Sequence, residues 1–460
     1  MSSKKGKPFI IIGSAVVVLI GLSFVPWSDL TGGYIKDFNL LGDLFGSETT
    51  AVTASETIDP ELEKALAEAD AQSKRPVAGD ASVTTTASPE HVKPAAAPRI
   101  NDEMVIEDYT ANSQGLAHFR AALDNRATRP ARIAVIGDSY IEGDILTMNI
   151  REMLQDTYGG CGVGYMPVSS PLVGFRTSVK QTCNGWTEHD IRKQSKDEYK
   201  SLAGEYFTSS AGAKSTYSGT SKLRHLDAWD NTRFLFVAPS DATVTIATDG
   251  GEQTFNVTGS GDVQCLSVPG HTTTASIKTA NAGLQALGVY LDGNNGVAVD
   301  NMSLRGNSGI THRKISNTLA SQMRRDVDYD LIIVEYGINA LSSQQSDYSG
   351  YRKLMEQTMA KLKECYPKAD ILMLGIGDRG QKINGSVVSV PTSDNMVTAQ
   401  RTAARNAGVL FWDTREAMGG EGAVVTWREK GFINPDYIHL NAKGGAELAR
   451  IFVNSLKKSL

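Results

Sequence analysis

The stretch Arg132-Ile-Ala-Val-Ile-Gly-Asp-Ser-Tyr-Ile-Glu-Gly-Asp-Ile-Leu146 decides the fold class. Its apolar run, Ile133–Ile136, is typical of a strand buried on both faces, and the Gly137-Asp138 pair predicts a sharp turn after it. The run Gly143–Thr157 then has the composition of a helix. A strand that leads through a tight turn into a helix is the repeating unit of a parallel sheet covered on both faces.

The same alternation returns in the second half of the chain. Apolar runs predict strands, and helical spacing of apolar residues predicts helices, at these positions: strands 331–336, 371–376 and 409–413; helices 107–125, 351–366 and 443–457. The expected fold is therefore α/β, with a parallel sheet between two layers of helices.

The middle of the chain, about 185–292, follows a different period. Short segments rich in β-formers are separated at close intervals by Gly, Pro, Asn and Asp, namely 233–237, 243–248, 254–257, 263–268 and 275–279. This pattern is typical of an all-β sandwich or barrel, so an antiparallel β-domain is expected to interrupt the α/β domain.

The N-terminus has the pattern of an exported protein. Lysines 4, 5 and 7 precede an uncharged run from Phe9 to Val25, which as a helix would be roughly 26 Å long. No Ala-x-Ala-like cleavage site follows, which favours an uncleaved membrane anchor over a cleaved signal peptide. The segment after it is rich in Ala, Thr, Ser, Pro and Glu, and is expected to be a flexible tether.

Charge and cysteine content exclude some classes of protein and leave others open. The net charge of −5 gives no basic surface for nucleic acid. The histidines are scattered without a zinc motif, so no metal or cofactor is expected. The four cysteines allow a disulfide between Cys161 and Cys183, or four buried thiols.

Ser139 is the first candidate for chemistry, because it follows the first predicted strand. Reacting groups of open α/β sheets gather at the carboxyl ends of the strands. The sequence places Ser139 at the start of a helix, where the dipole favours negative charge; it is then either a nucleophile or only the cap of that helix.

Asp436 and His439 supply what a serine nucleophile needs. An imidazole can remove the hydroxyl proton, and a carboxylate three residues away can fix its tautomer and orientation. The alternative is a capping role for Asp436 and a surface position for His439.

Two further segments lie at predicted strand ends. In Glu335-Tyr-Gly-Ile-Asn339, the Asn339 side chain can donate to a developing oxyanion, or it is a turn residue. In the segment 300–309, the backbone N–H of Gly306 can approach a ligand closely, or Gly306 only makes a turn.

The order of these residues resembles the SGNH (GDSL-type) hydrolase family over about 101–180 and 290–460. The resemblance implies the flavodoxin-like fold of that family and a serine esterase. It makes Ser139 the nucleophile, His439 the general base and Asp436 its partner. The oxyanion hole would be the Ser139 and Gly306 N–H groups with the Asn339 side chain. In this chain Ala340 replaces the aspartate that often follows the asparagine, and the serine and glycine segments are unusually far apart.

The layout is similar to periplasmic peptidoglycan O-acetylesterases, which carry a carbohydrate-binding-like β-sandwich between those segments. The expected organisation is a transmembrane anchor (1–30), a linker (31–100), a first hydrolase segment (101–184), the β-sandwich (185–292) and a second hydrolase segment (293–460). The expected location is the periplasmic side of the inner membrane.

The resemblance implies a carbohydrate O-acetylesterase that acts on an O-acetylated envelope glycan. One alternative is a glycan O-acetyltransferase that receives acetyl groups from a membrane-bound acyltransferase. Another is an inactive glycan-binding scaffold, which the presence of Ser139, Asp436 and His439 argues against.

Overall fold

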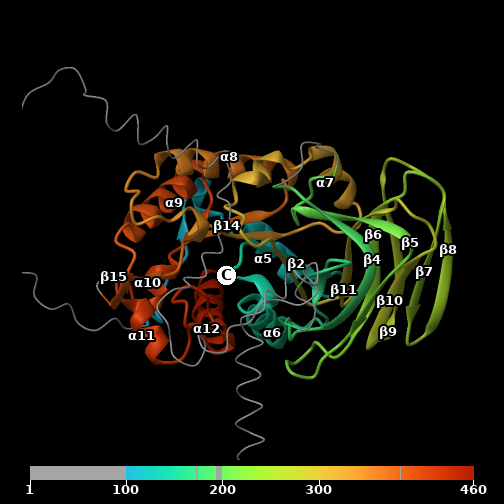
Figure 1. Ribbon diagram of the computed structural model, residues 1–460, viewed down its shortest axis with the longest axis horizontal. Helices are drawn as coiled ribbons and strands as arrows, with labels where there is room; N and C mark the ends of the chain where they lie inside the picture. The colour runs from blue at the N-terminus through green and yellow to red at the C-terminus, as the bar shows by residue number, and fades with distance from the viewer. Residues whose placement is uncertain (1–99, 172–174, 193–198, 384) are drawn as a thin grey trace, which may run out of the picture. The chain divides into compact units, whose positions relative to one another are not determined.

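A six-stranded sheet forms the centre of the hydrolase part (Figure 1). The computed structural model describes residues 100–171, 175–192, 199–383 and 385–460. The strand order is β1-β17-β14-β13-β2-β12. All neighbours pair in parallel except the short β1, which is antiparallel to β17. The strands are β1 (Glu107–Asp108), β2 (Ala131–Gly137), β12 (Val297–Ser303), β13 (Leu331–Glu335), β14 (Asp370–Leu374) and β17 (Leu410–Trp412).

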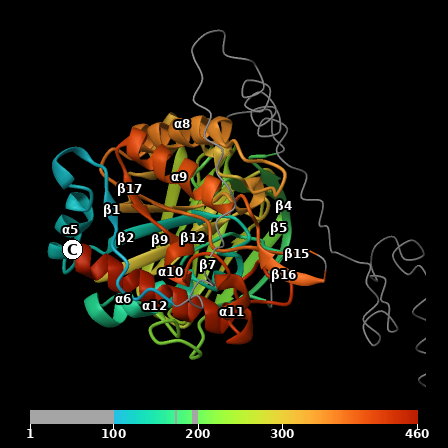
Figure 2. The same cartoon turned by 90° about the vertical axis from the view of Figure 1, so that its left-hand side faces the viewer.

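Helices cover both faces of this sheet, as Figure 2 shows with α8 and α9 on one side and α6 and α12 on the other. The helices are α5 (Ala117–Asp124), α6 (Thr147–Tyr158), α7 (Asn317–Met323), α8 (Ser349–Cys365), α9 (Ser393–Ala407), α10 (Thr414–Met418), α11 (Ala423–Glu429) and α12 (Ala442–Ser459). Short 3₁₀ turns are η1 (Ala111–Ser113), η2 (Glu142–Asp144), η3 (Ile310–Lys314) and η4 (Ile338–Ala340). The predicted α/β class is confirmed.

The side chains of β2 explain why both faces need cover. Ala134 and Ile136 pack into the cluster under α7, α8 and α9, whereas Ile133 and Val135 pack into the one under α5, α6 and α12. All four are fully buried. A strand with both faces buried reads as a continuous apolar run, which is the pattern that predicted it.

A nine-stranded antiparallel sheet, called here the β-module, occupies residues 164–292 (Figure 1). Its strands are β3 (Gly164–Met166), β4 (Lys180–Asp190), β5 (Glu205–Ser218), β6 (Trp229–Val237), β7 (Ala242–Thr248), β8 (Gly251–Val257), β9 (Val263–Thr272), β10 (Thr274–Thr279) and β11 (Gln285–Asp292). The long strand β5 pairs with β11 at one end and with β10 at the other. The sheet thereby curves around one apolar cluster, which includes Phe234 and Ile246.

Two predicted boundaries differ from the structure. The predicted start of the β-domain, residue 185, falls within β4, because the polar residues before it show no apolar alternation. The predicted helix 107–125 is helical only from Ala117. Asp108 accepts hydrogen bonds from the N–H groups of Thr110 and Gly115, at 2.9 and 3.0 Å, and so holds a turn where a helix was expected.

A buried ion network joins the β-module to the parallel sheet. Arg132 on β2 pairs with Asp292 at the end of β11 and, at 2.9 Å, with Asp300 on β12. Arg233 on β6 also pairs with Asp292, at 2.8 Å. The Arg132 side chain is 5% exposed and both carboxylates are fully buried. Each charge therefore has a partner, as charges taken out of water require.

The N-terminal membrane anchor expected from the sequence cannot be compared with the structure. The expected anchor, and the linker up to residue 99, lie outside the described residues. Within the described ranges no helix is long and apolar enough to cross a bilayer.

All four thiols are free, so the Cys161–Cys183 disulfide considered above is absent. Both side chains have other partners, Asp230 for Cys161 and Ser169 for Cys183.

The ion network gives a test of how the two parts are held together. Arg132→Met leaves Asp292 and Asp300 buried without their shared partner, so we expect the free energy of unfolding to fall by about 3–5 kcal/mol. Arg224→Met is the matched control, since the Arg224 side chain is 67% exposed and pairs with Glu152 on the surface. The free energy of unfolding of Arg224→Met, measured by urea titration, should fall by less than about 1 kcal/mol. Equal losses in the two variants would contradict this account.

Candidate active site

The register of the parallel sheet brings three candidate residues to one edge. Gly137 at the end of β2 lies opposite Ser303 of β12 and Glu335 of β13. Ser139, Gly306 and Asn339 each follow within four residues of those strand ends. Their segments therefore leave the sheet side by side, although they lie far apart in the sequence.

Ser139 does not begin a helix, contrary to the sequence-based expectation. The helix α6 starts only at Thr147. Gly143 and Asp144, with φ angles of 72° and 69°, lie in the left-handed region and separate the serine turn from the helix. The Asp144 carboxylate accepts hydrogen bonds from Arg151 at 2.8 and 3.2 Å, which holds this conformation. The capping alternative and the dipole argument for Ser139 are both wrong.

Ser139, His439 and Asp436 form a continuous hydrogen-bonded relay. The Ser139 Oγ lies 2.9 Å from His439 Nε2, and His439 Nδ1 lies 2.8 Å from Asp436 Oδ2. A carboxylate can only accept, so the imidazole proton is on Nδ1 and Nε2 is free to accept the serine proton. This is the arrangement in which a serine hydroxyl becomes a nucleophile.

Asp436 acts both as a turn cap and as the partner of His439. Its Oδ1 accepts the backbone N–H groups of Ile438 and His439, at 2.9 and 3.0 Å. Partial burial would raise the pKa of Asp436. The hydrogen bonds from the His439 ring and from the two backbone N–H groups outweigh burial and lower it to about 2. The carboxylate therefore stays charged throughout the neutral pH range.

The loop that carries Asp436 and His439 is fixed at several points. Gly380 donates its N–H to the Tyr437 carbonyl at 2.9 Å, and Ile433 bridges to Leu440. After this loop, α12 begins close to neighbouring backbone. A Cβ at Gly444 would lie 2.0 Å from the Phe432 carbonyl oxygen, and one at Gly445 would lie 2.2 Å from that of Ile145. These two glycines allow the helix after His439 to pack this closely.

Two backbone N–H groups are free to bind an oxyanion. Within the described residues, the N–H groups of Ser139 and Gly306 donate to no protein acceptor. Gly306 has a φ of 72°, a left-handed conformation that glycine adopts without strain. Unpaired N–H groups beside a nucleophile are what acyl transfer uses to stabilise a developing negative charge.

Asn339 has a support that sequence reasoning missed. Its Nδ2 donates to Asp138 Oδ2 at 2.9 Å and to the Asn307 carbonyl at 3.2 Å. Asp138, fully buried, also accepts the Tyr140 N–H at 2.9 Å. Asp138 therefore orients the Asn339 side chain in a protein that has Ala340 directly after the asparagine. The sequence signal for this role was the position of Asp138 directly before Ser139, but the sequence alone does not show the contact with Asn339. Both Nδ2 hydrogens are engaged here, so Asn339 reaches an oxyanion only by sharing or releasing one of them.

A second buried carboxyl lies under the serine turn. Glu335 is 2% exposed, and its Oε2 has no hydrogen-bond partner among the described residues. Burial, and then the nearby Asp138 charge, raise the pKa of Glu335 well above its usual value. Both effects favour the neutral form of Glu335, and the Asp138 carboxylate is the group that orients Asn339.

The relay predicts a large loss in Asp436→Asn. An asparagine amide that donates to Nδ1 would favour the wrong imidazole tautomer, so we expect kcat for ester hydrolysis to fall by about 10²–10⁴ with little change in KM. Steady-state kinetics on an acetyl ester would measure this. A loss below about threefold would show that Asp436 only caps the turn.

The contact between Asp138 and Asn339 predicts coupled effects. Asn339→Ala should lower kcat by about 10²–10³ if its amide helps to hold the oxyanion. Asp138→Asn should lower kcat less, and the double variant should be no worse than Asn339→Ala, because the two residues act as a unit. Additive losses would mean that Asp138 acts independently of Asn339.

Comparisons with known proteins agree with this geometry. Residues 267–446 match the model of the GDSL-like lipase/acylhydrolase family. The matched range includes Gly306, Asn339, Asp436 and His439, and the fold brings Ser139 to them. A search of curated protein sequences finds no match for the chain.

Solved structures show similarity at low sequence identity. One described as a peptidoglycan O-acetylesterase in action is 23% identical with a TM-score of 0.63, over 77% of this chain and 98% of that chain. An acetyl xylan esterase is 16% identical with a TM-score of 0.26, over 35% of this chain and 81% of that one. A family two carbohydrate esterase from Clostridium thermocellum is 10% identical with a TM-score of 0.27, over 60% and 98%.

At 23% identity the first of these matches shows the fold alone, and the other two, with TM-scores below 0.5, carry no argument. The predicted family resemblance and enzyme class are confirmed. With its match to the GDSL-like lipase/acylhydrolase family over residues 267–446, the chain is a serine esterase with the SGNH hydrolase fold.

Proposed function

We propose that this esterase removes O-acetyl groups from a cell-envelope glycan, with peptidoglycan as the first candidate. The observation that carries the proposal is the relay, in which Ser139 Oγ lies 2.9 Å from His439 Nε2. The N–H groups of Ser139 and Gly306, which donate to no acceptor among the described residues, support it. The likeness to a peptidoglycan O-acetylesterase over 98% of that chain supports the choice of substrate. That likeness also supports reading the β-module as part of the same enzyme rather than as an unrelated appendage.

The reaction proceeds in two halves with no need for another reactant besides water. His439 Nε2 accepts the Ser139 proton as Oγ attacks the acetyl carbonyl carbon, and Asp436 stabilises the imidazolium. The N–H groups of Ser139 and Gly306, with Asn339, hold the tetrahedral oxyanion. As the intermediate collapses, the sugar oxygen leaves and takes the proton from His439. Water then attacks the acetyl-enzyme with His439 as base, and acetate and free Ser139 are formed.

The N-terminal sequence supports a location for this reaction. In our proposal the run Phe9–Val25 anchors the chain in the inner membrane, and the linker lets the catalytic part reach envelope glycan in the periplasm. An acyltransferase partner is not needed for hydrolysis. It belongs only to the transfer alternative, in which a sugar hydroxyl rather than water attacks the acetyl-enzyme.

Acetate release from O-acetylated peptidoglycan tests this proposal. The full chain in detergent should release free acetate without any acceptor, and Ser139→Ala should abolish the release. Ser240→Ala, an exposed serine between β6 and β7, is the matched control and should retain full activity. Acetyl groups recovered only as new esters on an added acceptor glycan would contradict hydrolysis and favour the transferase. Acetate release by Ser139→Ala at the wild-type rate would contradict the nucleophile.

A further inference from the structure

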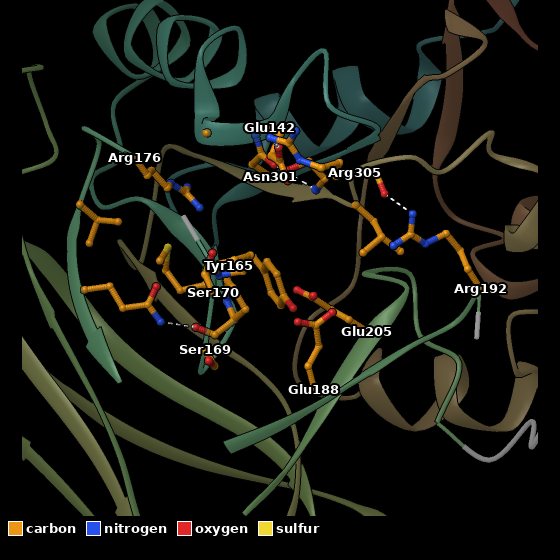
Figure 3. A pocket seen from close by; sticks show the side chains of 18 residues that line it. Glu142, Tyr165, Ser169, Ser170, Arg176, Glu188, Arg192, Glu205, Asn301 and Arg305 are labelled. Carbon is orange, nitrogen blue, oxygen red and sulfur yellow. Dashed lines mark hydrogen bonds and ion pairs between the residues drawn. The ribbon is translucent and has the colours of Figure 1, made fainter. Parts of the chain in front are cut away.

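A cavity of about 210 Å³ lies between the catalytic loops and the β-module (Figure 3). Glu142 and Arg305 line it from the hydrolase part, and Tyr165, Glu188 and Glu205 line it from the β-module. It is smaller than the roughly 300–1,000 Å³ pockets that take drug-sized ligands, so it has room for one small polar unit. None of these residues takes part in the relay.

The first indication that the cavity binds a ligand comes from the hydroxyl group of Tyr165. The residue is 2% exposed, and its hydroxyl has no hydrogen-bond partner among the described residues. In Figure 3 its ring points toward the carboxyl groups of Glu188 and Glu205. Leaving a buried hydroxyl unpaired costs about 1–3 kcal/mol, so a group that supplies its missing partner would be bound favourably.

The Tyr165 ring is held in this orientation by its surroundings. Its own N–H donates to Asp300 at 2.8 Å, and its ring packs edge-on against Tyr290 with centroids 5.5 Å apart. A Cβ at Gly288, where φ is 146°, would lie 2.3 Å from the ring. The bulge between Ala286 and Gly288 thus brings the backbone against the ring. The hydroxyl cannot turn away to find another partner.

The charges around the cavity indicate the kind of ligand. Burial, followed by repulsion from Glu188, Asp190 and Glu142, raises the pKa of Glu205 well above its usual value. Three arginines, Arg176, Arg192 and Arg305, line the same cavity. The arginines are paired with carboxylates, Arg176 with Asp144, Arg192 with Asp190 and Arg305 with Glu142, and the raised pKa of Glu205 favours its neutral form. The lining therefore selects for neither a cation nor an anion. A neutral ligand rich in hydroxyl groups can donate to the carboxylates and accept from the arginines and Tyr165.

The cavity is joined directly to the catalytic loops. Glu142 follows Ser139 by three residues and pairs with Arg305, which immediately precedes Gly306. Arg192, after β4, donates to the Arg305 carbonyl and is itself held by Asp190 at 2.8 Å. A ligand in the cavity therefore contacts the same segments that carry the nucleophile and the oxyanion donor.

We propose that the cavity is a sugar-binding subsite, in which Tyr165 and Glu205 recognise hydroxyl groups of a sugar unit beside the acetylated one. The inference rests on the proposed function and deepens it. It makes the β-module part of the substrate site, since Tyr165, Glu188 and Glu205 come from β3, β4 and β5. The enzyme would then recognise a glycan chain rather than an isolated acetyl ester.

Tyr165→Phe tests the subsite, because it removes a hydroxyl that has no partner among the described residues and should not lower the melting temperature. The measurement is the ratio of kcat/KM on O-acetylated glycan to kcat/KM on 4-nitrophenyl acetate, which cannot fill the cavity. We expect this ratio to fall at least about tenfold in Tyr165→Phe and also in Glu205→Gln. Tyr290→Phe, the buried neighbour that does not line the cavity, should keep the wild-type ratio. An unchanged ratio in Tyr165→Phe would overturn the subsite.

A binding measurement separates this inference from the proposed function. De-O-acetylated glycan oligosaccharide is titrated into Ser139→Ala and into the Ser139→Ala, Tyr165→Phe double variant by calorimetry. Binding that weakens at least about tenfold in the double variant supports the subsite, even if the wild-type enzyme releases no acetate from glycan and the proposed substrate is wrong. Equal affinity in both variants, or binding in neither, would overturn the subsite whatever the result of the acetate assay.

Discussion

The parallel register of β2 with β12 and β13 is the constraint on which the site depends. Because Gly137 lies opposite both Ser303 and Glu335, the turns after these strands leave the sheet at one edge. A slip of one residue in either pairing would move the turn after that strand by about 3.3 Å and separate the residues of the site. The alternating burial of Ile133 to Ile136 against two helix layers therefore fixes the positions of Ser139, Gly306 and Asn339 as well as the fold.

The β-module lies in the chain between Ser139 and Gly306 without disturbing this register. The Arg132 network joins β11, the last strand of the β-module, to β2 and β12 through buried charges. Its strand β6 contributes Leu235 and Val237 to the core that also contains α7, α8 and α9, while Phe234 and Phe236 face the interior of the module. A domain packed in this way can hold substrate-binding groups at a fixed distance from the catalytic residues.

The sequence predicted what depends on short-range patterns. Buried strands appear as apolar runs, and the Asp436–His439 pair needs only a turn to bring its groups together. Contacts between distant segments could not be predicted. Asp138 accepts a hydrogen bond from Asn339, 201 positions away. The Tyr165 hydroxyl, which has no partner among the described residues, belongs to a cavity that exists only after folding. The helix predicted over 143–157 begins only at Thr147, because Gly143 and Asp144 have left-handed φ angles and Asp144 binds Arg151. The β-domain was predicted to begin at residue 185, within β4, because the first residues of that strand are polar.

The central claim is that Ser139 is the nucleophile of this esterase. A 4-nitrophenyl organophosphonate, which phosphonylates an activated serine hydroxyl, tests it directly. Peptide mass mapping should find one modified residue, Ser139, with activity lost in proportion to the fraction modified. His439→Ala should react far more slowly, because the hydroxyl would lose its base. Full inactivation with Ser139 unmodified, or full activity with Ser139 completely modified, would contradict the account.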